Sequence, residues 1–157
     1  MTRVLSSGLA VVAGVVVPAT VSPNQTRSTP APQYRRDPRL QTLREFFGKA
    51  ECPALAYSQV FLDAADRYAL DWRLLPSISF IESTGGKATR NNNLFGWDSG
   101  RAQFDSPAAA IHAVGYRLSH SNLYKNKDLN DLLATYNRSM EYAQKVKSVM
   151  RRIALAE

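Results

Sequence analysis

The chain has 157 residues, 45% of them hydrophobic, and a formal net charge of +7. This length and composition favour one domain with a sizeable core over two domains. The residues from Leu40 onward have fifteen basic against twelve acidic side chains, so the charge of the folded part does not indicate a nucleic-acid-binding domain. A single cysteine, Cys52, excludes an intramolecular disulfide and is expected to be a small buried residue.

The first residues are typical of an export signal. Arg3 supplies a positive charge, and residues 4–17 form an uncharged run rich in Val, Leu, Ala and Gly. This run is shorter than the roughly 20 apolar residues of a membrane span. The small side chains of Val17 and Ala19 predict cleavage after Ala19, which gives a signal peptide of residues 1–19. We therefore expect export to the periplasm or cell surface of a bacterium, with no stable membrane span after cleavage. An uncleaved signal anchor is the alternative.

The next segment has the composition of a flexible linker. Residues 20–39 are rich in Pro, Ser, Thr and Arg, and five of the eight prolines of the chain lie at or before Pro38. Such a segment buries too little apolar surface to fold by itself. We expect a disordered tether at residues 20–39 and a folded domain at residues 40–157.

The folded domain is expected to be mostly α-helical. A typical N-cap residue precedes four of the expected helices, at Asp71, Ser106, Asp128 and Ser139. The pattern predicts five or six helices and, over residues 90–101, a short loop or hairpin rich in Asn and Gly. Apolar side chains recur at helical spacing in five segments, at residues 57–68, 74–81, 111–118, 129–136 and 142–153.

Glu82 stands out as a candidate general acid. It follows Ile78 by four residues and Leu75 by seven, so it projects from the apolar face of its helix, at the C-terminal end. Burial and the negative pole of the helix both disfavour ionisation of such a carboxyl. A carboxyl that stays protonated near neutral pH can donate a proton in catalysis. The alternative is a helix-terminal glutamate exposed to water.

The loop after Glu82 contains side chains suited to a sugar. Phe95 and Trp97 are aromatic, and aromatic faces stack on sugar rings. Residues 91–93 are three asparagines, whose amides suit hydroxyl and acetamido groups. The alternative is that the two aromatic residues belong to the core beneath the loop.

Four elements of the sequence, in order, resemble the glucosaminidase domains of glycoside hydrolase family 73, which are mannosyl-glycoprotein endo-β-N-acetylglucosaminidase-like. They are FIESTGGK at residues 80–87, NNLFGW at residues 92–97, FDSP at residues 104–107 and YNRSMEY at residues 136–142. The resemblance extends over roughly residues 57–153. The pair Tyr136-Asn137 also resembles the Ala-Tyr-Asn motif of soluble lytic transglycosylases.

The resemblance implies a lysozyme-like α+β fold and cleavage of β-1,4 bonds in the glycan strands of peptidoglycan. It makes Glu82 the catalytic acid and Tyr136 a catalytic hydroxyl at the reaction centre. His112 and His120 are eight residues apart without a matching carboxylate or cysteine, so no metal or cofactor is expected. We expect a monomer whose partner is the glycan strand and not a nucleic acid. The residues implied to bind substrate are Asn92, Asn93, Phe95, Trp97 and Asp98.

One departure from the family keeps other functions open. Glycosidases normally use two carboxylates, and residues 83–91 between the acid and the next motif contain none. Asp98 is the best candidate for a second carboxylate, and Asp105 is the next. Without one, the substrate acetamido group could act as nucleophile, or the muramic acid 6-hydroxyl could attack as in a lytic transglycosylase or muramidase. A catalytically weak peptidoglycan-binding module is the alternative from another class.

Overall fold

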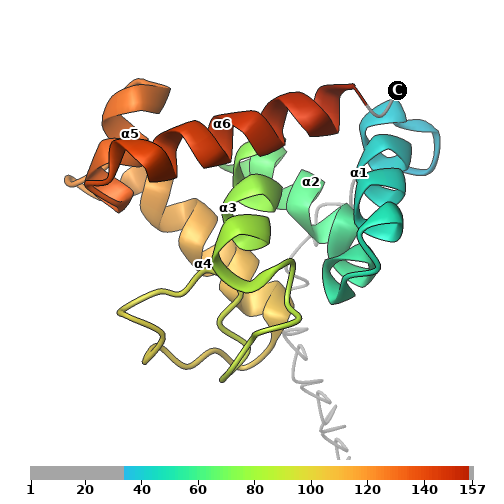
Figure 1. Ribbon diagram of the computed structural model, residues 1–157, viewed down its shortest axis with the longest axis horizontal. Coiled ribbons are helices and arrows are strands. Elements are labelled where there is room, and N and C mark those ends of the chain that lie inside the picture. Colours follow the sequence, from blue (N-terminus) through green and yellow to red (C-terminus); the bar gives the residue numbers. More distant parts are fainter. Residues whose placement is uncertain (1–33, 156–157) are drawn as a thin grey trace, which may run out of the picture. The chain divides into compact units, whose positions relative to one another are not determined.

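The computed structural model describes residues 34–155 (Figure 1). The expected signal peptide and residues 20–33 of the expected tether lie outside these residues. The described part contains helices and no strand, so the prediction of a mostly α domain is confirmed, while residues 90–101 form turns instead of a hairpin. The elements are the 3-10 helices η1 (Tyr34–Arg36) and η2 (Pro53–Tyr57) and the α-helices α1 (Pro38–Lys49), α2 (Ser58–Arg67), α3 (Leu74–Ser83), α4 (Pro107–His120), α5 (Leu129–Tyr136) and α6 (Met140–Ala154).

Three of the four predicted N-caps are confirmed. The side chains of Ser106, Asp128 and Ser139 accept hydrogen bonds from the backbone N–H three residues later, at the starts of α4, α5 and α6. Each bond satisfies an N–H that the helix itself leaves without a partner. The prediction for Asp71 is wrong, because α3 begins at Leu74 without a side-chain cap. The Asp71 carboxylate instead accepts from the backbone N–H of Arg73 and pairs with its guanidinium group at 2.6 Å.

The folded part begins before Leu40, the expected boundary. The Tyr34 side chain is buried, and its hydroxyl donates to the Asp66 carboxylate of α2 at 3.0 Å. Asp37 caps α1 by accepting from the backbone N–H of Arg39. The Arg39 guanidinium group pairs with Asp37 and with Asp66. Residues 34–39 are therefore part of the domain, although their composition resembles that of the tether.

Helix α3 is at the centre of the packing and positions Glu82. All residues from Leu74 to Ser79 are buried, and α2 and α6 pack against the helix (Figure 1). A helix buried over so much of its surface, including the polar Ser77 and Ser79, depends on the helices that surround it. Helix α3 ends at Ser83, and the left-handed backbone of Thr84 turns the chain into the loop of residues 84–106. Among residues 34–155, none of the helices has the length and apolar character needed to cross a bilayer.

Candidate active site

Glu82 lies in the last turn of α3 and is half-buried. Burial raises the pKa of its carboxyl above the ordinary value, as expected from its position on the apolar face. The structure thus favours the protonated form of Glu82 over a wider pH range than for an exposed glutamate. That property is the first requirement of a general acid near neutral pH.

The backbone of Gly96 packs directly against the Glu82 carboxyl. A Cβ atom added at Gly96 would lie 2.7 Å from Oε2 of Glu82, closer than non-bonded atoms approach. Gly96 also has a φ of +59°, in the left-handed region that favours glycine. The loop can therefore cover one side of the carboxyl, which contributes to its burial, only with glycine at this position.

Asparagine side chains hold this loop in shape. Asn93 is buried, and its amide accepts from the Trp97 N–H and donates to the Trp97 carbonyl, both at 2.9 Å. The Asn92 amide donates to the Phe104 carbonyl at 2.8 Å. Phe95 is completely buried. Asn92, Asn93 and Phe95 were expected to contact substrate, and the structure places all three in the internal support of the loop.

Tyr136 ties α5 to the same loop. Its hydroxyl donates a hydrogen bond to the Phe95 carbonyl at 2.7 Å. Burial raises the pKa of Tyr136, and the charge of Glu82 raises it further. The hydroxyl therefore stays protonated, and its proton is engaged by the backbone next to Gly96. Tyr136 and Glu82 line the same cleft, and the hydroxyl of Tyr136 makes a positioning contact there.

Tyr142 has an unpartnered hydroxyl beside Glu82. Its ring stacks on that of Tyr136, with centroids 5.9 Å apart and planes 7° from parallel. The hydroxyl is close enough to lower the pKa of Glu82, which partly offsets the effect of burial. The two groups do not meet in hydrogen-bond geometry, and within residues 34–155 the buried Tyr142 hydroxyl has no partner. The sequence alone does not reveal which atoms the Tyr142 hydroxyl faces.

Glu82 opens into a cleft of about 300 Å³. Trp97 contacts two other aromatic residues there, with ring centroids 5.5 Å from Tyr136 and 6.2 Å from Tyr124. The cleft joins residues of four separate segments into one concave surface with aromatic and polar walls. Its lining residues are Glu82, Gly96, Trp97, Asp98, Ser99, Tyr124, Tyr136 and Asn137.

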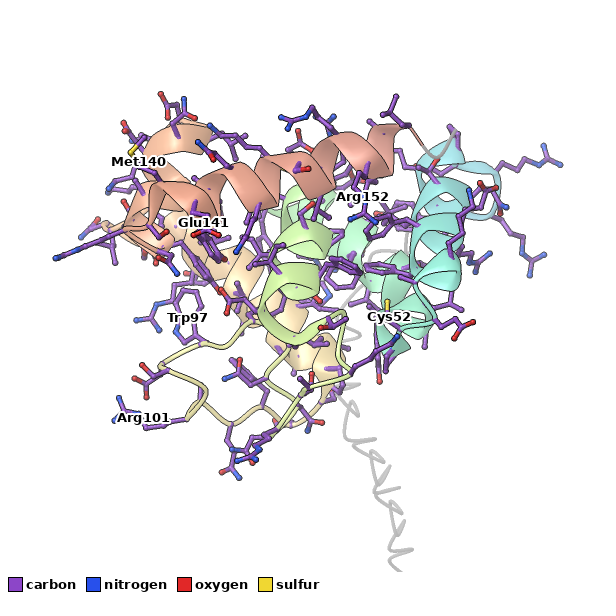
Figure 2. The ribbon with its side chains drawn as sticks, viewed as in Figure 1. Cys52, Trp97, Arg101, Met140, Glu141 and Arg152 are labelled. Carbon is purple, nitrogen blue, oxygen red and sulfur yellow. The ribbon has the colours of Figure 1, made fainter. Side chains whose placement is uncertain are left out.

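Asp98 is the second carboxylate in the cleft lining. Its side chain is 56% exposed and pairs with the Arg101 guanidinium group at 2.8 Å. Figure 2 shows Arg101 at the tip of the loop, pointing away from the helices. Asp105, the other sequence candidate, is exposed and is not among the residues that line the cleft. The cleft thus combines one shielded carboxyl with one carboxylate that is solvated and ion-paired.

Comparisons with protein-family models, with curated proteins and with solved structures find no match to this chain. Its function is therefore argued from the geometry of the cleft and from the motifs that form it.

The contact between Gly96 and Glu82 predicts a specific loss of stability. Gly96→Ala should lower the free energy of unfolding by about 1–3 kcal/mol more than Gly100→Ala, as expected for an overpacked site. Gly100 is a matched control, because its φ is also positive, at +81°, but an added Cβ would meet open space. Urea unfolding of both variants measures the difference. In a Glu82→Ala background the difference should largely disappear, and equal costs of the two glycine substitutions in the native background would contradict the contact.

Proposed function

We propose that the chain is a glycosidase that cleaves β-1,4 bonds in the glycan strands of peptidoglycan, as an endo-β-N-acetylglucosaminidase with Glu82 as general acid. The observation that carries the proposal is the half-buried Glu82 carboxyl, with its raised pKa, at the wall of a cleft lined by aromatic rings. A glycosidic oxygen needs a proton as it leaves, and a protonated carboxyl held in a concave site can supply it.

The surroundings of Glu82 support both of its protonation states. In the proposed reaction the carboxyl donates its proton to the leaving oxygen and becomes a carboxylate. The unpartnered hydroxyl of Tyr142 can then rotate towards that carboxylate and donate a hydrogen bond to it. Tyr136 and Gly96 keep the loop against the carboxyl throughout. The proton leaves on the new sugar hydroxyl, and the negative charge on Glu82 is stabilised by a group that is already in place.

The rest of the cleft suits a strand of N-acetylated sugars. Trp97, Tyr124 and Tyr136 supply aromatic surface against which a pyranose ring can pack. Ser99 and Asn137 add polar groups at the cleft wall for hydroxyl and acetamido groups. Asn137 thereby takes the role that the sequence had assigned to Asn92 and Asn93, whose amides are engaged by the loop backbone.

Three of the four motifs of the family resemblance contribute residues to this cleft. FIESTGGK covers the end of α3, NNLFGW forms the loop that covers Glu82, and YNRSMEY runs from the end of α5 into α6. This convergence supports a lysozyme-like origin of the domain as part of the proposal. Export to the periplasm or cell surface is proposed with it, because the substrate lies outside the cytoplasmic membrane.

Anhydro-forming cleavage, as in a lytic transglycosylase, is the second candidate. It is favoured by the state of Asp98, which is exposed and paired with Arg101 and so is poorly held for action on a sugar ring. In that reaction the muramic acid 6-hydroxyl replaces water as the attacking group, and a single carboxyl suffices.

The direct test of the proposal is digestion of purified peptidoglycan. The full chain is incubated with wall preparations, and released glycan fragments are measured over time against a heat-treated sample. We expect fragments to accumulate in proportion to the amount of protein. Binding to the walls without any release of fragments would indicate that the chain is a wall-binding module and not an enzyme.

The position of Tyr142 predicts a shift in the pH dependence. Its hydroxyl lowers the pKa of Glu82, so Tyr142→Phe should raise that pKa further. Because Glu82 must be protonated to act, activity falls as pH rises through its pKa, and the alkaline limb of the profile should move to higher pH in the variant. Initial rates of wall cleavage measured across pH check this. An alkaline limb that stays in place or moves to lower pH would show that Tyr142 does not act on Glu82.

A further inference from the structure

The cleft has an arginine at its side that the proposed reaction does not use. Arg117 is in the last turn of α4, and its Cζ lies over the Trp97 ring, 5.2 Å from the centroid. Its charge also lowers the pKa of Tyr124, which opposes the effect of burial on that phenol. Trp97 and Tyr124 both line the cleft, so the positive charge of Arg117 acts on two of its walls.

Arg117 keeps its hydrogen-bonding capacity free. Within residues 34–155 its side chain makes no ion pair and no hydrogen bond, whereas Arg101 is paired with the Asp98 carboxylate of the cleft. The stacking on Trp97 restricts the guanidinium group without using its N–H donors. A guanidinium group in this state is suited to bind a carboxylate through two parallel hydrogen bonds.

The charges around the cleft favour an anion at this place. Burial favours the neutral form of Glu82, and the Asp98 charge is offset by Arg101. The Arg117 charge has no such compensation among the described residues. An acidic ligand group beside Trp97 would therefore meet a net attraction.

We infer that Arg117 is a specificity-determining residue that binds a carboxylate on the substrate strand, so that the cleft selects acidic glycans over neutral ones. This inference rests on the proposed glycosidase function and identifies the chemical feature of the strand that is recognised. The carboxylate can belong to the lactyl ether of a sugar or to a peptide attached there, since both present the same group.

The test compares native walls with walls whose carboxylates have been converted to amides. Wild-type full-chain protein should cleave native walls at least about tenfold faster than amidated walls. This is the effect expected for one charge-assisted hydrogen-bond pair. In Arg117→Gln the ratio should fall close to one through a lower rate on native walls. Arg117→Lys should keep only part of the preference, because lysine retains the charge but not the paired N–H donors. Arg44→Gln is the matched control, because it removes the same charge from exposed Arg44 on α1, which contributes no residue to the cleft.

Co-sedimentation keeps this inference separate from the proposed catalysis. The same arginine substitutions are made in a Glu82→Gln background, and binding to native and amidated walls is compared. If the wild type cleaves neither wall, the glycosidase proposal fails while the binding ratio still tests Arg117. An Arg117→Gln substitution that weakens action or binding on both walls equally would make Arg117 only a support for Trp97 and would overturn the inference. A wild-type protein that cleaves and binds native and amidated walls equally well would also overturn the inference.

Discussion

Glu82→Gln is expected to reduce cleavage of peptidoglycan by about 10²–10⁴-fold, the usual contribution of a general acid. Glutamine keeps the shape of the side chain in its contact with Gly96 but has no acidic proton. Initial rates of fragment release from purified walls measure the loss. Glu45→Gln is the matched control, since Glu45 is on α1 and lies outside the cleft. A folded Glu82→Gln variant with a near-normal rate would contradict the assigned role.

The same substitution should increase stability at neutral pH. Because burial raises the pKa of Glu82, the folded protein holds the proton more tightly than the unfolded chain does. As pH rises above about 4.3, the unfolded chain ionises first, and the folded state loses stability until its own pKa is passed. Glutamine carries no such cost, so its advantage in the free energy of unfolding should appear above that pH and vanish below it. This gain would show that lost activity does not come from lost folding.

Tyr136→Phe is the second substitution with a large expected effect. It removes the hydrogen bond to the Phe95 carbonyl, which should cost about 1–3 kcal/mol of stability if that carbonyl stays unsatisfied. The loop would then be free to shift from Glu82, and small displacements of a catalytic site can cost up to about 10²-fold in rate. Asp98→Asn should lose much less of the cleavage rate, because the Asp98 carboxylate is exposed and paired with Arg101.

Rates of both variants on the same wall preparation, with the free energy of unfolding of each, measure this difference. Tyr116→Phe is the control for loss of a phenol, because Tyr116 is 55% exposed and its hydroxyl makes no hydrogen bond with the described residues. If Asp98→Asn proves as inactive as Glu82→Gln while Tyr136→Phe is nearly normal, a two-carboxylate hydrolase becomes the better account.

Features set by neighbouring residues could be predicted from the sequence. The caps at Ser106, Asp128 and Ser139 depend on side chains within three residues of the N–H that they accept from. Helical spacing placed Glu82 on the apolar face of its helix, while its burial also depends on the Gly96 loop that covers the carboxyl. Helix α1 was not among the five segments located from the sequence. Its start was assigned to the linker of residues 20–39, although Asp37 followed by proline is itself a helix-start signal.

Features that depend on contacts distant in sequence could not be predicted. Asn93 was correctly assigned to the loop beside Glu82, but the direction of its amide is set by the turn that closes on Trp97. Tyr142 reaches Glu82 because α6 packs against α3, and Tyr124 reaches the cleft from the turn after α4. The sequence therefore identified the carboxyl and the loop, and the structure was needed to separate groups that face the cleft from groups that hold it together.

Mass spectrometry of glycan fragments, released in water enriched in heavy oxygen, tests the central claim most directly. The full chain and its Glu82→Gln variant are incubated with the same purified peptidoglycan. The account predicts fragments with new N-acetylglucosamine reducing ends that carry the heavy oxygen, formed by the wild type and absent with the variant. Fragments with anhydro ends would instead indicate the transglycosylase reaction of the same site. Intact strands with the wild type, or identical fragments at equal rates with Glu82→Gln, would contradict the account.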